Sequence, residues 1–133
     1  MILSEGFKTL ILVEGNTLMR KTDKKIDNQI RCELTIMCEE ALKNIKGFEW
    51  LTHTADFSNF PQSLKVYFIF DERVNINNYL ESHRKNNIMS DLSTAFKKIN
   101  VKINNIEDYI FYDSQDDCEY QHGGNWVLRL KQH

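Results

Sequence analysis

The stretch LKVYFIF, residues 64–70, decides the fold of this chain of 133 residues. Its aromatic and β-branched residues are typical of a β-strand. Successive side chains of a strand point to opposite faces of the sheet, and apolar residues occupy both sets of positions here. We therefore predict a central strand that is covered on at least part of each face.

Two further strands are predicted around this one. Residues 48–57 are rich in aromatic and β-branched side chains, and residues 58–63 contain the only proline of the chain. Together with residues 64–70 they predict a hairpin. Farther along the chain, the run Tyr-Ile-Phe-Tyr at residues 109–112 predicts a third strand in the core.

A long amphipathic helix is predicted ahead of the strands, from about Thr22 to Lys46. We expect Thr22 or Asp23 to cap its start, and Gly47 to take a left-handed conformation after its end. Apolar residues recur at steps of three and four, so they form one stripe along the helix: Ile26, Ile30, Leu34, Met37, Cys38, Ala41, Leu42 and Ile45.

A second helical region is predicted between about residues 75 and 100. The polar residues 83–87 separate two apolar stripes, so we expect two helices or one helix kinked near Asn86 and Asn87. The segment from Trp126 to Leu130, which follows a turn signal with two glycines, is expected to be a short helix or strand that closes the core.

The order helix, strand, strand, broken helix, strand predicts a two-layer α+β fold. We expect a sheet of three or four strands with helices on one face, and a single domain over residues 19–133. Residues 1–18 have two open interpretations, an N-terminal extension or an extra edge strand around residues 8–14, where the run Leu-Ile-Leu-Val occurs.

Composition limits the function only loosely. The formal net charge of −2 argues against a surface that is basic throughout, but it allows a local basic patch. Three widely spaced cysteines do not suggest a disulfide framework, which favours a reducing compartment, the cytoplasm. No apolar run approaches the length of about 18 residues that a membrane span requires, so we expect no membrane partner.

The order of elements resembles ribosome-binding factor A, a bacterial factor of small-subunit maturation with a type II KH-like fold. The resemblance covers roughly residues 26–114, and it is carried by the long first helix ending at Gly47, the hairpin around residues 58–63, the strand at 64–70 and the run 89–99 followed by residues 109–114. It implies a KH-like domain that contacts RNA or the ribosome.

A second resemblance is more specific and covers about residues 19–130. Residues 19–23, 47–53, 60–64 and 122–126 are similar to a small family of uncharacterised bacterial proteins, some of which carry the label Fis-family transcriptional regulator. That label implies a transcription-related role. A Fis-type DNA-binding end needs a basic helix-turn-helix, however, and the last twenty residues hold Trp126, two glycines and an acidic lead-in instead.

The candidate nucleic-acid-binding residues lie in the second helical region, where five basic residues stand against one acid, Asp91. Clustered positive charge is what phosphate binding needs, because the release of condensed counterions drives it. A solvated helix face is the alternative interpretation. The five basic residues are Arg84, Lys85, Lys97, Lys98 and Lys102.

Three aromatic residues are candidates for an interaction surface, Trp50, Phe60 and Trp126. Aromatic rings such as these and Phe57 can stack on bases or anchor a partner, although packing in the core or the hairpin explains them as well. Our first hypothesis is a non-enzymatic binding or regulatory protein that contacts RNA or the ribosome. The alternative is a protein-interaction or transcription-related regulatory module, a homo-oligomer included, that does not bind nucleic acid itself.

A third hypothesis, an enzyme or metal protein, has the least support in the sequence. Residues 107–119 hold six acids and no base, which we expect to form an acidic surface loop rather than a cation site, since the spacing is not that of an EF-hand. Cys118 and His122 are spaced for one helical face, but structural zinc takes four ligands. We assign no catalytic residue, no metal ligand and no cofactor.

Overall fold

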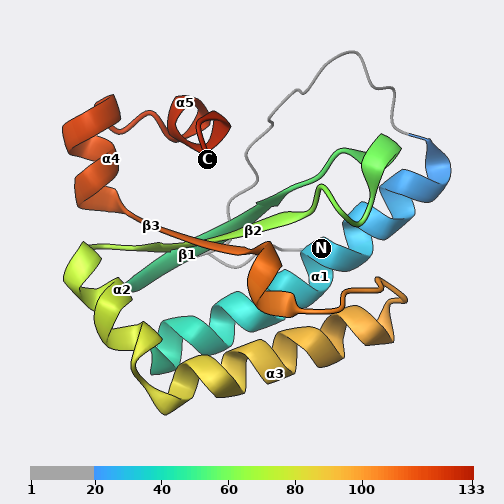
Figure 1. Cartoon of the computed structure of the whole chain (residues 1–133), viewed down its shortest axis with the longest axis horizontal. Coiled ribbons are helices and arrows are strands. Elements are labelled where there is room, and N and C mark those ends of the chain that lie inside the picture. The colour runs from blue at the N-terminus through green and yellow to red at the C-terminus, as the bar shows by residue number, and fades with distance from the viewer. Residues whose placement is uncertain (1–19) are drawn as a thin grey trace.

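The computed structural model describes residues 20–133, so the two interpretations of residues 1–18 lie outside the described residues (Figure 1). Within this part, two short 3-10 turns, η1 (Phe57–Asn59) and η2 (Ile106–Tyr109), accompany the helices and strands. The main elements in chain order are α1 (Lys21–Asn44), β1 (Phe48–Thr54), β2 (Lys65–Phe70), α2 (Arg73–Leu80), α3 (His83–Lys98), β3 (Ile110–Ser114), α4 (Gln115–His122) and α5 (Trp126–Lys131).

The described sheet has three strands in the order β1-β2-β3. β1 pairs antiparallel with β2, with Leu51 opposite Phe68, and β2 pairs parallel with β3, with Phe68 opposite Tyr112. The predicted α+β class, the order of the elements and the central place of residues 64–70 are therefore confirmed. All the residues from Val66 to Phe70 are buried.

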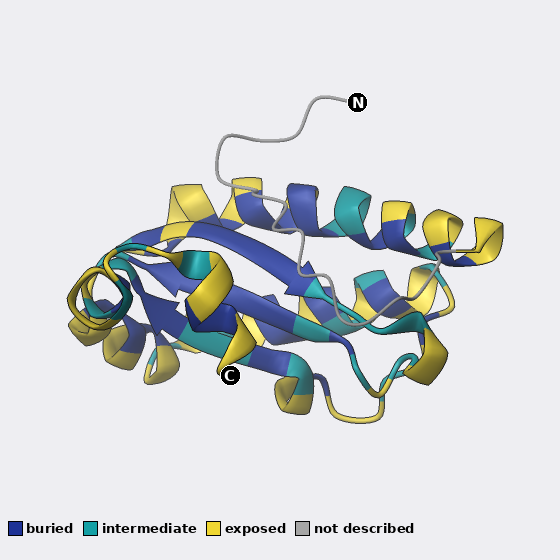
Figure 2. Ribbon diagram, turned by 90° about the horizontal axis from the view of Figure 1, so that it is seen from above, coloured by how far each residue is buried: buried dark blue, intermediate teal, exposed yellow. Residues whose placement is uncertain are grey.

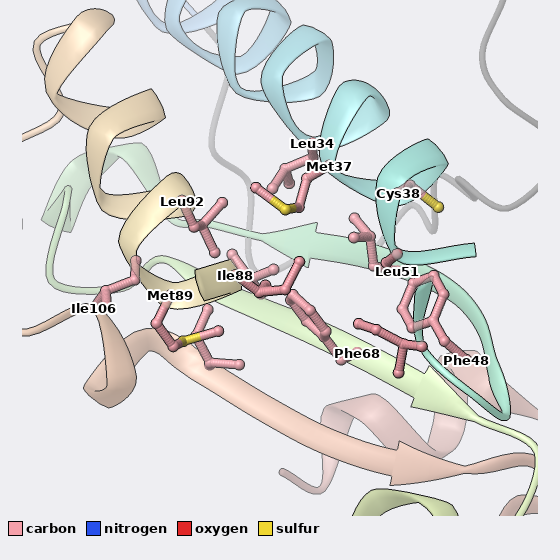
Figure 3. Packing of buried hydrophobic residues seen from close by; sticks show 14 of the residues in the cluster. Leu34, Met37, Cys38, Phe48, Leu51, Phe68, Ile88, Met89, Leu92 and Ile106 are labelled. Atoms are coloured by element: carbon pink, nitrogen blue, oxygen red, sulfur yellow. The ribbon is translucent and has the colours of Figure 1, made fainter. Parts of the chain in front are cut away.

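The main core lies between one face of the sheet and the two long helices, α1 and α3. Figure 3 shows Leu34 and Met37 of α1 and Leu92 of α3 directed toward the sheet residues Leu51 and Phe68. Figure 2 shows the molecule from above, with a largely buried sheet and helices whose residues alternate between buried and exposed. The predicted stripe of α1 is buried except at its edges, since Ile26 is partly buried and Leu42 is 43% exposed.

A smaller core occupies the opposite face of the sheet, where α5 packs. There the side chains of Trp50, Tyr67, Ile69 and Leu130 form a buried cluster, and Trp126 packs against it. The structure thus adds a helix on the second face to the predicted layer on the first (Figure 1). The reason is the one seen in the sequence, because a central strand with apolar residues on both sides must be covered twice.

The interruption of the second helical region lies earlier than predicted. α2 ends at Leu80 and α3 begins at His83, whereas Asn86 and Asn87 lie exposed inside α3. The break lies at Ser82, whose backbone is extended (ψ of 159°) and whose hydroxyl donates to the carbonyl oxygen of Tyr79 at 2.6 Å. Of the two predicted alternatives, two helices are confirmed and a single helix kinked near Asn86 is wrong, because asparagine lowers helix stability by only a few tenths of a kcal/mol.

The prediction that residues 107–119 form an acidic surface loop is wrong, because the run is divided among η2, the strand β3 and the first half of the helix α4. Ser114 caps it by accepting a hydrogen bond from the amide of Asp117 at 3.4 Å, and Gly123, with a φ of 59°, ends it. Asp116 and Asp117 lie in the first turn, where negative charge favours the helix dipole. The acids therefore have a structural role that their composition alone did not indicate.

The two-layer packing leads to a first prediction, on α1. Leu34 is fully buried and Ile36, two residues on, is 56% exposed. We expect Leu34→Ala to lower the free energy of unfolding by about 3 kcal/mol, because it removes buried methyl groups and leaves a cavity. The matched control Ile36→Ala should change it by less than about 0.5 kcal/mol. Urea unfolding of both variants checks this, and equal effects would contradict the arrangement.

Candidate nucleic-acid interface

The five predicted basic residues do not form one patch. Arg84 and Lys85 lie at the start of α3, whereas Lys97 and Lys98 lie in its last turn, about 20 Å farther along the helix axis. Lys102 follows the helix. The ammonium nitrogen of Lys85 lies 2.6 Å from a carboxylate oxygen of Glu107, and its side chain is 24% exposed. The structure therefore separates Arg84 and Lys85 from the other three residues.

The start of α1 supplies lysines that the prediction did not include. Lys21, Lys24 and Lys25 are all exposed. The two acids of this segment are buried, because Asp23 is 7% and Asp27 is 8% exposed. What the first turns of α1 present to solvent is therefore positive charge alone.

Both buried acids are held by specific partners. The carboxylate of Asp23 accepts hydrogen bonds from the backbone amide of Arg20 at 3.3 Å and from its guanidinium at 3.2 Å. It acts in the third helical position, so Asp23 is part of the cap without being the cap residue itself.

Asp27 fastens the first half of α1 to strand β1. Its carboxylate lies 2.7 Å from Nε2 of His53 in β1 and 2.8 Å from Nε of Arg31, one helical turn on. Burial by itself raises the pKa of Asp27, but the hydrogen bonds from His53 and Arg31 outweigh it, so the pKa lies below its ordinary value. Asp27 is thus a charged anchor that positions the neighbouring lysines.

The fold brings the start of α1 and the end of α3 to the same end of the molecule, because the two helices pack side by side and run in opposite directions (Figure 1). Lys98 reaches across to Glu33 of α1, with 3.0 Å between the ammonium nitrogen and a carboxylate oxygen, while its side chain stays 70% exposed. We call this region the lysine end, and define it as Lys21, Lys24, Lys25, Lys97, Lys98 and Lys102.

An open depression of about 660 Å³ lies on the lysine end. Lys21, Lys24 and Lys25 line it together with the amide side chains of Asn28 and Gln29, and the rest of the lining is Cys32, Glu33 and Ile99. Among residues 20–133, Lys98 alone of the six lysines makes an ion pair, with Glu33. The lining therefore combines exposed lysines and one acid with amide groups that can both donate and accept hydrogen bonds.

One signal in the sequence points to the missed lysines. Lys21 and Lys24 lie in the first turn or so of a helix, where the dipole disfavours positive charge. Their proximity to Lys97 and Lys98 has no local signal, because those residues are more than 70 positions away in the sequence and meet α1 only through the fold.

The predicted interaction residues have different places. Trp50 is 2% exposed and packs edge-to-face on Trp126, with 5.1 Å between ring centroids, while Trp126 donates a hydrogen bond from Nε1 to Gln115 at 3.0 Å. These two residues join α5 to the sheet and offer little surface to a partner. Phe60 is partly exposed at the tip of the β1–β2 hairpin.

A second buried carboxylate, Asp113, ties the C-terminal helix to the sheet. Arg129 donates two hydrogen bonds to it, at 2.6 and 2.8 Å, and Nε2 of His133 lies at 2.8 Å. Burial alone raises the pKa of Asp113, but His133, Arg129 and the amide of Ser114 outweigh it and hold the pKa far below its ordinary value. Asp113 stays charged at neutral pH and is occupied by structural partners.

The residues proposed for an enzyme or metal site, Cys118 and His122, do not form a site together. Cys118 is fully buried, and burial raises the pKa of its thiol, which disfavours the reactive thiolate. His122 instead faces Arg129, with 3.1 Å between Nδ1 and the guanidinium. Within residues 20–133 no three histidine, cysteine or acidic side chains gather as ligands for a metal ion.

Comparison of the chain with family models, with curated proteins and with solved structures found no match. No helix within residues 20–133 has both the length and the apolar character that crossing a membrane requires.

The Asp113 cluster leads to a second prediction. Asp113→Asn keeps the shape but leaves Arg129, which is 8% exposed, without a charged partner, so we expect a loss of about 3 kcal/mol of unfolding free energy at pH 7. The exposed acid Asp108 is the control, and Asp108→Asn should have almost no effect. Urea unfolding measures both variants.

The same experiment has a pH dependence of known sign. The pKa of Asp113 is lower in the folded chain than the value of about 3.9 in the unfolded chain. Its stabilisation is therefore complete above that pH and is lost as the pH falls toward the folded pKa. The gap between wild type and Asp113→Asn should narrow below about pH 4. A gap that stays constant down to pH 2 would contradict the role of this carboxylate.

Proposed function

We propose that this chain is a non-enzymatic RNA-binding domain, and that the lysine end is the surface that contacts RNA. The observation that carries the proposal is the burial of the local acids. Asp23 and Asp27 are withdrawn into the fold, and the lysines beside them are exposed. The first turns of α1, of mixed sign in the sequence, thereby expose only basic side chains among their charged residues, and Glu33, farther along α1, pairs with Lys98.

Phosphate contact is the chemistry that suits such a surface. Each lysine that neutralises a phosphate releases condensed counterions, and the gain does not require fixed geometry. Flexible, exposed lysines supply this contact, and the amide groups of Asn28 and Gln29 in the depression offer partners for the 2′-hydroxyl of a ribose. RNA therefore suits this surface better than a small charged metabolite, which would need an enclosed pocket.

The net charge does not oppose a local basic surface. Acids at the starts of α2 and α4, at the other end of the long axis (Figure 1), lie among basic residues, and Arg73 pairs with Asp117 at 2.6 Å. A chain with a net charge of −2 can therefore bind RNA through the lysine end alone.

Charge reversal on α1 tests the proposal. We expect Lys24→Glu/Lys25→Glu to weaken binding of a fluorescently labelled RNA hairpin at least tenfold in an anisotropy titration. The slope of log affinity against log salt should also fall by about 1.5, since each lost phosphate contact removes about 0.7 to 0.9.

The matched control lies at the other end of the same helix. Lys43→Glu/Lys46→Glu makes the same change of charge at exposed positions, and it should weaken binding no more than about twofold, through long-range repulsion alone. Arg84→Glu, at the start of α3, should behave like this control. Equal losses in all three variants, or no RNA binding by the wild type at low salt, would overturn the proposal.

A further inference from the structure

Two aromatic rings are displayed at the tip of the β1–β2 hairpin. Phe57 and Phe60 stack on each other, with 4.9 Å between centroids and 27° between planes, and both are partly exposed. Phe60 packs against the main core, whereas Phe57 is not part of that cluster. The core therefore holds Phe60 in place, and Phe57 stacks on it from outside.

The backbone of the tip is fixed by its own hydrogen bonds. The hydroxyl of Ser63 accepts from the amide of Asp56 at 2.8 Å and donates to its carbonyl oxygen at 2.7 Å. The amide and hydroxyl of Ser58 donate to the carboxylate of Asp56 at 2.9 and 2.6 Å. The rings are thus pre-organised, which lowers the entropy that a ligand must remove on binding.

The one acid of the tip is engaged locally. The hydrogen bonds from the side chain and backbone of Ser58 lower the pKa of Asp56, so it is charged at neutral pH. Its carboxylate is engaged by groups of its own turn.

The tip lies at the lysine end of the molecule. α1 leads into β1 at the opposite edge of the sheet, and Asp27 in its first half contacts His53 near the end of β1, so α1 starts near the tip. α3 runs antiparallel to α1, and Lys98 at its end pairs with Glu33 of α1. Figure 1 shows all three segments at one end, and Phe60, Ile26 and Ile99 pack against the same core.

We propose that the lysine end and the Phe57–Phe60 stack together bind single-stranded RNA. The proposal rests on the RNA-binding function above and names the class of RNA. The lysines hold successive phosphates, and a base that is not paired stacks on the outer face of Phe57. Bases in an RNA duplex are stacked inside the helix, so a duplex gains the contacts of the lysines without that of the ring.

Substitution of Phe57 tests this with two labelled ligands, a single-stranded RNA of mixed sequence and the duplex that it forms with its complement. We expect Phe57→Ala to weaken binding of the single strand about tenfold, since one stacked base contributes between fivefold and a hundredfold. Binding of the duplex should change less than twofold. Phe57→Tyr, which keeps a ring, should restore single-strand binding.

The salt slope separates this proposal from the function on which it rests. Stacking releases no counterions, so Phe57→Ala should leave the slope unchanged while Lys24→Glu/Lys25→Glu lowers it. Equal loss for both RNAs in Phe57→Ala, or no loss for either, would overturn the single-strand proposal and leave RNA binding intact. Preference for a protein ligand, with no RNA bound at low salt, would overturn both.

Discussion

The structure depends on one constraint, the burial of strand β2 on both faces. A strand without a polar side cannot lie at a surface, so it needs a neighbour on each edge and a layer on each face. The short hairpin supplies the antiparallel neighbour β1, and the parallel neighbour β3 requires a crossover, which α2 and α3 provide. With α3 packed antiparallel to α1, the hairpin tip, the start of α1 and the end of α3 lie at one end (Figure 1).

Charge is arranged on this frame by burial as much as by sequence. Asp27 of α1 contacts β1, and Asp113 belongs to β3 and contacts α5, and each is held by an arginine and a histidine. These carboxylates are stabilised as anions inside the fold, where they join α1 and α5 to the strands. The lysines near Asp27 remain outside. Pairing of buried acids therefore leaves one end of the surface with a charge that the net charge of the chain does not reveal.

The fold could be predicted from the sequence where the pattern was strong. The central strand, the hairpin and the stripe of α1 follow from periodicity, and the structure confirms them. Leu42 lies at the edge of the stripe and is 43% exposed, which periodicity alone does not distinguish from full burial. The acidic run was taken as a loop, because the cap at Ser114 has no distinct pattern in a stretch that is polar throughout.

The candidate site was predicted less well, for a physical reason. Lys97, Lys98 and Lys102 were recognised as a basic group, but their partners on α1 are brought to them by antiparallel helix packing, which no local pattern encodes. Arg84 and Lys85 were included because they are close in sequence. Each residue of a helix adds about 1.5 Å along its axis. α3 is therefore long enough to place its two ends on different parts of the surface, although they are close in sequence.

The position of lysines at the start of α1 is not explained by the stability of the fold. Asp116 and Asp117 at the start of α4, and Lys97 and Lys98 at the end of α3, all suit the dipole of their helix. Lys21 and Lys24 oppose the dipole of α1, at a cost of roughly 0.3 to 1 kcal/mol each. The partly exposed Phe57 is a second local choice that folding does not require. Residues that do not favour stability are expected at functional surfaces. Here the lysines of α1 and the exposed ring of Phe57 occur at the same end of the molecule.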